Sequence, residues 1–68
     1  MKHEKSNELL RIREVCRRTG MSRTTVYDRI SKGAFPKPLH LSSRLVVWPS
    51  YDVDEWINRT ITQLRGKQ

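Results

Sequence analysis

Apolar positions along this 68-residue chain form two short helix-like stretches, then an alternating stretch, then a longer helix-like one. The first stretch has apolar or small side chains at i, i+3, i+4 and i+7, namely Ile12, Val15, Cys16 and Thr19. This spacing predicts a helix from about Ile12 or Arg13 to Thr19. Gly20 is expected to end it, because glycine takes the left-handed conformation after a helix without a Cβ penalty. The run 9–12 fits a short strand or a lead into this helix, since periodicity cannot separate the two.

A second helix is predicted from Ser22 to about Lys32. Ser22 is a favourable N-cap, and Val26 and Ile30 recur at helical spacing. Gly33 is expected to end this helix as Gly20 ends the first. Two short helices joined by so few residues must cross steeply, which indicates a helix-turn-helix arrangement.

The alternating stretch follows two prolines and predicts a β-hairpin. Residues 35–38 cannot be helical, because each proline lacks an amide donor and restricts the residue before it. If Ser42-Ser43 is the loop, the core face carries Leu39, Leu41, Val46 and Trp48; a three-residue loop instead matches Leu39 and Leu41 with Leu45 and Val47. The first register is preferred because it buries Trp48, although a two-residue turn without glycine is strained.

The last helix is expected to start at Pro49-Ser50, with acidic residues in its first turn that complement the helix dipole. Its apolar stripe consists of Val53, Trp56, Ile57, Thr60, Ile61 and Leu64. Such a stripe is ordinarily core, and we favour that interpretation over a groove for a partner. The pattern predicts a flexible segment at 1–8, one domain at 9–64 and a disordered end at 65–68.

Charge is concentrated in one region of the chain. The formal net charge is +7, and the segment from Arg11 to Trp48 holds nine basic and two acidic residues, whereas the flanks balance. The positive field therefore belongs to one structural region, for which a polyanion is the natural partner.

Other classes of function have little support in the sequence. Cys16 is single, which excludes an internal disulfide and fits a reducing compartment, and neither His3 nor His40 has further ligands at metal spacing. No cofactor or metal site is expected, and no general base accompanies the acidic residues, which argues against an enzyme. No apolar run reaches bilayer length and the N-terminus is too polar for a signal peptide, so a soluble, cytoplasmic protein without membrane contact is predicted.

The order of elements and the residues within them resemble the AlpA-type phage and prophage regulators, in the wider group of MerR-like winged-helix excisionases. The resemblance covers 9–61 and rests on Leu9-Leu10-Arg11-Ile12, Glu14-Val15, Arg18 through Tyr27, Phe35-Pro36-Lys37-Pro38, Arg44, Val46, Trp48-Pro49, Val53 and Trp56-Ile57. It implies a mainly α-helical winged helix-turn-helix fold, three helices plus a small β-hairpin, in which the second helix reads DNA and the hairpin is a wing. At matching positions it implies contacts from Arg23, Thr24 and Tyr27 and from Arg44 on the wing. Relatives often have glycine and proline at the wing tip, where this chain has Ser42-Ser43.

Each candidate contact is expected to have its own role. Arg23 and Thr24 are the base-contact candidates, Tyr27 is expected to bind a phosphate, and the helix capped by Ser22 can face a phosphate with its amides. Asp28 either accepts from a cytosine amino group or pairs with a neighbouring arginine. The predicted backbone contacts are Arg17, Arg18, Lys32 and Lys37. The predicted wing contacts, in or beside the minor groove, are His40, Ser42, Ser43 and Arg44.

These expectations amount to a sequence-specific binder of double-stranded DNA. The resemblance implies transcriptional regulation in a prophage or integrated element, often of its integrase gene, and the alternative is an excisionase that bends attachment-site DNA together with an integrase. One small domain covers a short site, so self-association or cooperative binding is expected. A protein-interaction module built on the last helix is the distant alternative, and RNA binding is disfavoured because no sheet with exposed aromatic residues is expected.

Overall fold

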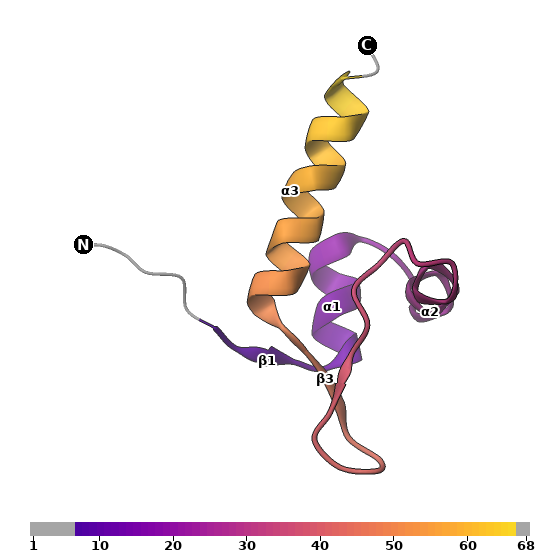
Figure 1. Ribbon diagram of the computed structural model, residues 1–68, viewed down its shortest axis with the longest axis vertical. Coiled ribbons are helices and arrows are strands. Elements are labelled where there is room, and N and C mark those ends of the chain that lie inside the picture. The colour runs from indigo at the N-terminus through magenta and orange to yellow at the C-terminus, as the bar shows by residue number, and fades with distance from the viewer. Residues whose placement is uncertain (1–6, 67–68) are drawn as a thin grey trace, which may run out of the picture.

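The computed structural model describes residues 7–66, and it contains three helices and three short strands within that range (Figure 1). In chain order the elements are β1 (Leu9–Leu10), α1 (Ile12–Thr19), α2 (Arg23–Ser31), β2 (Leu39–His40), β3 (Val46–Pro49) and α3 (Ser50–Gly66). This is the predicted winged helix-turn-helix, with three helices and a hairpin. Among the described residues, no helix combines the length and apolar character needed to cross a membrane.

β3 is the central strand of a three-stranded antiparallel sheet ordered β1-β3-β2. Leu10 pairs with Trp48, so the run 9–12 supplies a strand before the helix begins. Glu8 extends this pairing, because its carbonyl accepts from the Ser50 amide at 2.7 Å and its own amide donates to Ser50 Oγ at 2.9 Å. The hydrogen-bonded structure therefore includes Glu8, which was expected in the flexible segment; residues 1–6 and 67–68 lie outside the described residues.

Local signals set the ends of α1 and α2. Gly20 has φ +77°, and its amide donates to the Cys16 carbonyl at 2.9 Å, which closes the last turn of α1. Ser22 is the N-cap of α2, and its hydroxyl oxygen accepts from the Thr25 amide at 3.1 Å. The predicted bounds of α1 are confirmed and those of α2 agree to within one residue at each end, and Gly20 and Ser22 are confirmed as the capping residues.

Gly20→Ala is expected to lower the free energy of unfolding by about 1–2 kcal/mol, because a Cβ opposes the left-handed conformation. A Cβ at Gly20 would meet no atom within 4 Å, so the cost comes from the backbone alone. Gly66→Ala is the matched control, since Gly66 also has open space around it and does not have a positive φ. Urea unfolding of both variants measures the difference; equal midpoints would contradict the assignment of strain to Gly20.

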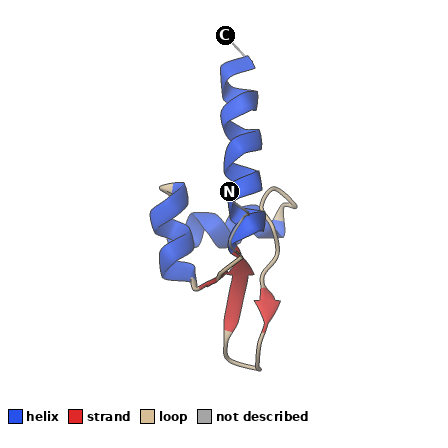
Figure 2. Ribbon diagram, turned by 90° about the vertical axis from the view of Figure 1, so that its left-hand side faces the viewer, coloured by secondary structure: helices blue, strands red, loops and turns tan. Residues whose placement is uncertain are grey.

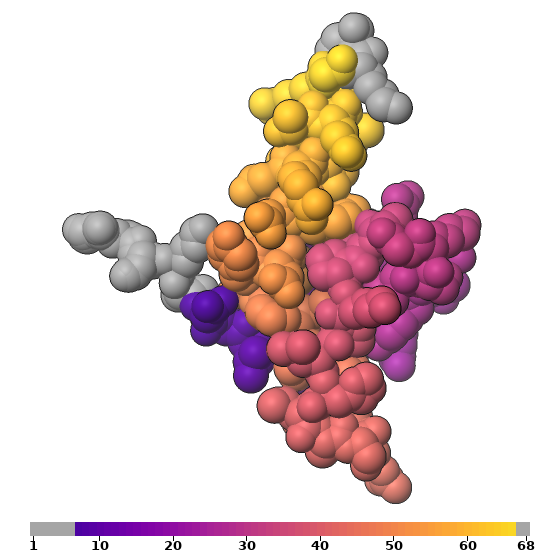
Figure 3. Space-filling model, viewed as in Figure 1, coloured from indigo at the N-terminus to yellow at the C-terminus, as the bar shows by residue number. Residues whose placement is uncertain are grey.

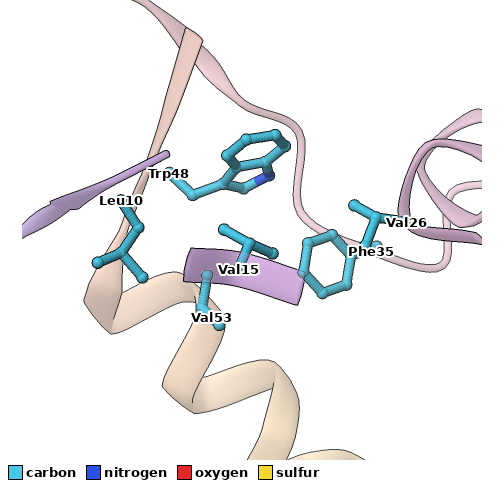
Figure 4. Close-up of a cluster of buried hydrophobic side chains, with 6 residues drawn as sticks. All are labelled: Leu10, Val15, Val26, Phe35, Trp48 and Val53. Carbon is cyan, nitrogen blue, oxygen red and sulfur yellow. The ribbon is translucent and has the colours of Figure 1, made fainter. Parts of the chain in front are cut away.

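One apolar cluster joins all the helices and two of the strands (Figure 4). Its buried members are Leu10, Val15, Val26, Phe35, Trp48 and Val53. Trp48 is fully buried, and its indole Nε1 donates to the Pro36 carbonyl at 2.9 Å. Trp56 of α3 holds the same connector, because its Nε1 donates to the Ala34 carbonyl at 2.8 Å and its ring meets Phe35 edge-on at 4.9 Å. The proline-containing segment is thus held by two tryptophans.

The preferred register of the wing was wrong, and the alternative is the one observed. Leu39 pairs with Val47, and the Leu41 amide donates to the Leu45 carbonyl at 2.9 Å, which leaves a three-residue loop at 42–44. The two-residue hairpin turns require positive φ, and no non-glycine residue in the described range adopts it. Leu39 and Leu41, expected in the core, are more than half exposed.

The apolar stripe of α3 is only partly core. Val53 is buried and Ile57 packs against the cluster, but Ile61 and Leu64 are 42% and 64% exposed. The second half of α3 projects beyond the rest of the domain (Figure 3). The helix also continues to Gly66, through two of the residues expected to be disordered. The interpretation of the whole stripe as core was therefore wrong for its last two turns.

Candidate nucleic-acid interface

α2 turns one side toward the core and leaves the other uncovered at the edge of the domain (Figure 1). Val26 is its only buried residue and Ile30 is half-buried. Its exposed residues include all five proposed groove contacts: Ser22, at the N-cap, then Arg23, Thr24, Tyr27 and Asp28. The structure thus places these five side chains together on an accessible helix.

Tyr27 connects α2 to the base of the wing. Its ring meets the Trp48 ring edge-on, with a centroid distance of 6.1 Å and an interplanar angle of 62°. Trp48 is itself fixed by burial and by its hydrogen bond to Pro36, so one side of the tyrosine ring rests on a rigid support. Tyr27 as a whole residue remains 37% exposed. α2 and the wing therefore have a defined relative position.

Some of the backbone amides at the N-terminus of α2 have hydrogen-bond acceptors within the chain, and others do not. The Ser22 hydroxyl accepts from the Thr25 amide and donates to Thr25 Oγ1 at 2.9 Å, so it is already occupied. The amides of Arg23 and Thr24 have no hydrogen-bond acceptor within residues 7–66. The Arg23 guanidinium is exposed and likewise has no ion pair there. These groups are available to an anion at the helix N-terminus.

Asp28 pairs with a lysine, whereas a neighbouring arginine was one of the two expected partners. Its carboxylate lies 3.2 Å from Lys32 Nζ, one turn along α2, and both side chains are more than half exposed. An exposed pair of this kind contributes little to stability and exchanges readily. Lys32 thus has its charge partly offset in the unbound protein.

Arg18 does not present a free charge, although it was predicted to contact the DNA backbone. Its guanidinium lies 3.5 Å from Glu8, 3.2 Å from Glu14 and 3.3 Å from Asp54, and its side chain is only 26% exposed. These carboxylates belong to the segment before β1, to α1 and to α3. A phosphate at this position would be repelled by three acids, so we remove Arg18 from the backbone contacts and assign it to holding the domain together.

Arg17 binds the same carboxylate of α1 from its solvent side. Its Nε donates to Glu14 Oε1 at 3.0 Å, and its side chain is 72% exposed. Hydrogen bonds from Arg17 first, and then from Arg18, lower the pKa of Glu14 from 4.5 to about 2. The same carboxylate raises the pKa of Arg17.

Glu14→Gln is expected to make the free energy of unfolding depend less steeply on pH in the acid range. The folded-state pKa of Glu14 is depressed, so its contribution is complete above the ordinary pKa of 4.5 and is lost as the pH falls toward about 2. The wild type should lose unfolding free energy more steeply than the variant across that interval, as measured by urea unfolding at successive pH values. Glu55→Gln, at an exposed position without an ion pair in residues 7–66, is the control. Parallel profiles for wild type and Glu14→Gln would contradict the arginine contacts.

The wing and the connector before it carry the remaining candidates. Lys37, His40, Ser42, Ser43 and Arg44 are all exposed, and the Arg44 amide donates weakly to Ser42 Oγ at 3.4 Å. Lys37 and Arg44 have no ion pair within the described residues. The loop at 42–44 forms the far end of the wing (Figure 2). Arg44, the basic residue of this loop, therefore lies at the tip of the wing.

Two basic residues of α1 and α2 that had no proposed role have the same free exposure. Arg13 on α1 and Arg29 on α2 are exposed and have no acidic partner in residues 7–66. At 100° per residue, Arg29 lies on the opposite flank of Val26 from Arg23. Both residues were included in the charge count. The sequence alone did not single them out, because it does not show which arginines are paired with carboxylates and which are left free to bind an anion. Across residues 7–66, no three His, Cys, Asp or Glu side chains come together as metal ligands, and His3 lies outside that range.

Comparison with known proteins identifies the family. Residues 8–61 match the family model for the prophage CP4-57 regulatory protein (AlpA). The chain is 31% identical over 65 residues to the DNA-binding transcriptional activator AlpA of Escherichia coli K12, covering 87% of this chain and 93% of that protein. It is 40% identical over 48 residues to the uncharacterized protein ORF88 of Enterobacteria phage P4, covering 71% of this chain and about half of that protein, 54%.

No solved structure matches the chain significantly. The family match spans the elements from β1 into the second half of α3, so it includes the helix-turn-helix, the wing and the packed part of α3. The chain belongs to the AlpA family of prophage regulatory proteins.

Proposed function

We propose that this protein is a sequence-specific binder of double-stranded DNA that regulates transcription in a prophage or related mobile element. The observation that carries the proposal is the uncovered N-terminal half of α2, where Arg23 and Thr24 are exposed and unpaired in the described chain beside a wing fixed through Tyr27 and Trp48. Short polar side chains and arginine at the start of a helix are the groups that reach base edges in the major groove. The printed function of the E. coli relative, a DNA-binding transcriptional activator, supports the same conclusion.

In this proposal α2 enters the major groove and its neighbours hold the backbone. Arg23 and Thr24 contact base edges, and Tyr27 binds a phosphate through its hydroxyl. Arg17, Lys32 and Lys37 supply the remaining backbone charge. Ser22 acts through the helix end that it caps, and Asp28 turns to a cytosine amino group when its pair with Lys32 opens.

The wing reaches beyond the site that α2 reads. Arg44 at its tip, flanked by Ser42, Ser43 and His40, lies in or beside the adjacent minor groove, where a narrow A·T-rich sequence favours a cation. A single domain of this size buries an interface at the low end for specific complexes, so we also propose cooperative binding of neighbouring copies.

The proposed target is the control region of the element's own integrase gene. The alternative target is the attachment site, where the protein would act as an excisionase together with an integrase. DNase footprinting of both regions at increasing salt tests these proposals together. Protection of a short site that persists at moderate salt is expected upstream of the integrase gene. Retention that is equal on all sequences and disappears at moderate salt would contradict specific binding, and protection at the attachment site alone would favour the excisionase role.

A further inference from the structure

The second half of α3 has an apolar edge that nothing in the described chain covers. Ile57, at the edge of the core, is followed at helical spacing by Ile61 and Leu64, which are 42% and 64% exposed. This part of the helix projects away from α1, α2 and the wing (Figures 1 and 3). A solvated helix end has no need of isoleucine and leucine in register with the core stripe, so this edge is suited to contact with another apolar surface.

Charge along α3 indicates what that surface is. α3 contains three acidic and two basic residues, whereas the rest of the described chain contains nine basic and three acidic residues. Two copies of so basic a protein repel each other least where α3 meets α3. The charges of α3 are also separated along its length, with Asp52, Asp54 and Glu55 near its start and Arg59 and Arg65 toward its end. An antiparallel partner of the same sequence is complementary to this arrangement.

We propose that two copies of this chain pair through the free halves of α3, antiparallel and related by a two-fold axis. Asp54 and Arg65 are 11 residues apart, about three turns or 16 Å, and so lie on the same flank of the helix. A crossing between residues 59 and 60 brings each Arg65 opposite the Asp54 of the second copy. In that register the Ile57, Ile61 and Leu64 side chains of the two helices interleave.

The first turns of α3 have room for the end of the second helix. A shallow hollow beside them is lined by Asp54, Ile57 and Asn58 of α3 together with Glu8 and Arg18. Asp54 binds Arg18 at 3.3 Å, yet its side chain is 57% exposed, so a second cation can reach it. The pairing covers neither α2 nor the wing, which project in other directions (Figure 1).

The interface is small. Two helical segments of about ten residues bury less than the ~800 Å² per partner of a standard stable complex. The pair is therefore weak in dilute solution and becomes populated at high protein concentration or on adjacent DNA sites, where the effective concentration rises. Because the contact is between two copies of the protein and involves no DNA, it can be tested without DNA. Its failure would therefore be distinguishable from a failure of the proposed function.

Sedimentation velocity of the full chain without DNA, from micromolar to millimolar concentration, tests the proposal. The wild type is expected to shift from monomer to dimer, and Ile61→Glu or Leu64→Glu to weaken that equilibrium at least tenfold while the thermal midpoint of unfolding stays unchanged. Gln63→Glu is the matched control, since it adds the same charge at an exposed position of α3 that lies at least 100° around the helix from both Ile61 and Leu64, and it should leave the equilibrium close to that of the wild type.

A charge exchange tests the antiparallel register. Arg65→Glu and Asp54→Lys each place like charges together in a homodimer and should weaken it severalfold, whereas an equimolar mixture of the two variants restores both opposite-charge contacts in the heterodimer. Thermal unfolding of Asp54→Lys checks that loss of its contact to Arg18 has not unfolded the domain. A wild type that stays monomeric to millimolar concentration, a dimer insensitive to Ile61→Glu and Leu64→Glu, or a mixture no more associated than its components would overturn the proposal.

Discussion

Trp48→Ala is expected to leave most of the protein unfolded at 25 °C. Trp48 is fully buried on the central strand, and it joins the cluster to which α1, α2, α3 and β1 also contribute. Truncating a buried tryptophan costs about 3–5 kcal/mol. A single core in a chain shorter than about 70 residues rarely supplies more than about 3–5 kcal/mol, so the variant loses most or all of its stability. Far-ultraviolet circular dichroism with urea titration measures the folded fraction.

Trp48→Phe separates the packing of this ring from its hydrogen bond. Phenylalanine keeps most of the apolar contact but cannot donate to the Pro36 carbonyl, as the indole does at 2.9 Å. A loss of about 1–3 kcal/mol is expected, with a folded protein in dilute buffer. If Trp48→Ala were as stable as Trp48→Phe, the place of Trp48 at the centre of the core would be contradicted.

The helices of the helix-turn-helix were predictable because their signals are local. The apolar spacing at 12–19, the left-handed Gly20 and the Ser22 cap all act within one or two turns of the chain, and each is found in the structure. The wing register was not predictable in the same way. The preference for a loop at Ser42-Ser43 rested on burying Trp48, but Trp48 is buried in the other register, where it contacts β1, α2 and the connector.

The availability of individual charges depends on contacts that are distant in sequence. Arg17 and Arg18 are adjacent and look alike in the chain, yet Arg18 reaches Glu8 and Asp54, which lie 10 and 36 positions away. Only the fold brings those carboxylates together. The stripe of α3 presents the same difficulty, because its periodicity continues past the point where the domain stops covering it. Periodicity defines an apolar face but not what covers it.

Arg23→Ala is expected to reduce affinity for the preferred DNA site by about 1–3 kcal/mol, roughly 5- to 150-fold, and to relax the preference at one position of that site. The reason is that Arg23 is exposed, has no ion pair in the described chain and lies in the first turn of α2, next to the supported Tyr27. A bidentate arginine contact to a base edge is lost, whereas binding to unrelated sequence depends on the other cations and changes little. Electrophoretic mobility shift with a panel of single-base variants of the footprinted site measures both effects.

Lys37→Ala is the informative comparison because it removes an exposed cation from the connector and not from α2. It should weaken binding to all sequences alike and lower the slope of log K against log salt by about one, as expected for one phosphate contact. Arg59→Ala, an exposed arginine on α3, controls for loss of a positive charge elsewhere and should change neither base preference nor the salt slope by a comparable amount. The proposed roles differ because a base contact requires the rigid geometry that Trp48 and Tyr27 give to α2, whereas a phosphate contact requires only that the side chain reach the backbone. If Lys37→Ala altered base preference while Arg23→Ala lowered all affinities equally, the groove would be read by a surface other than α2.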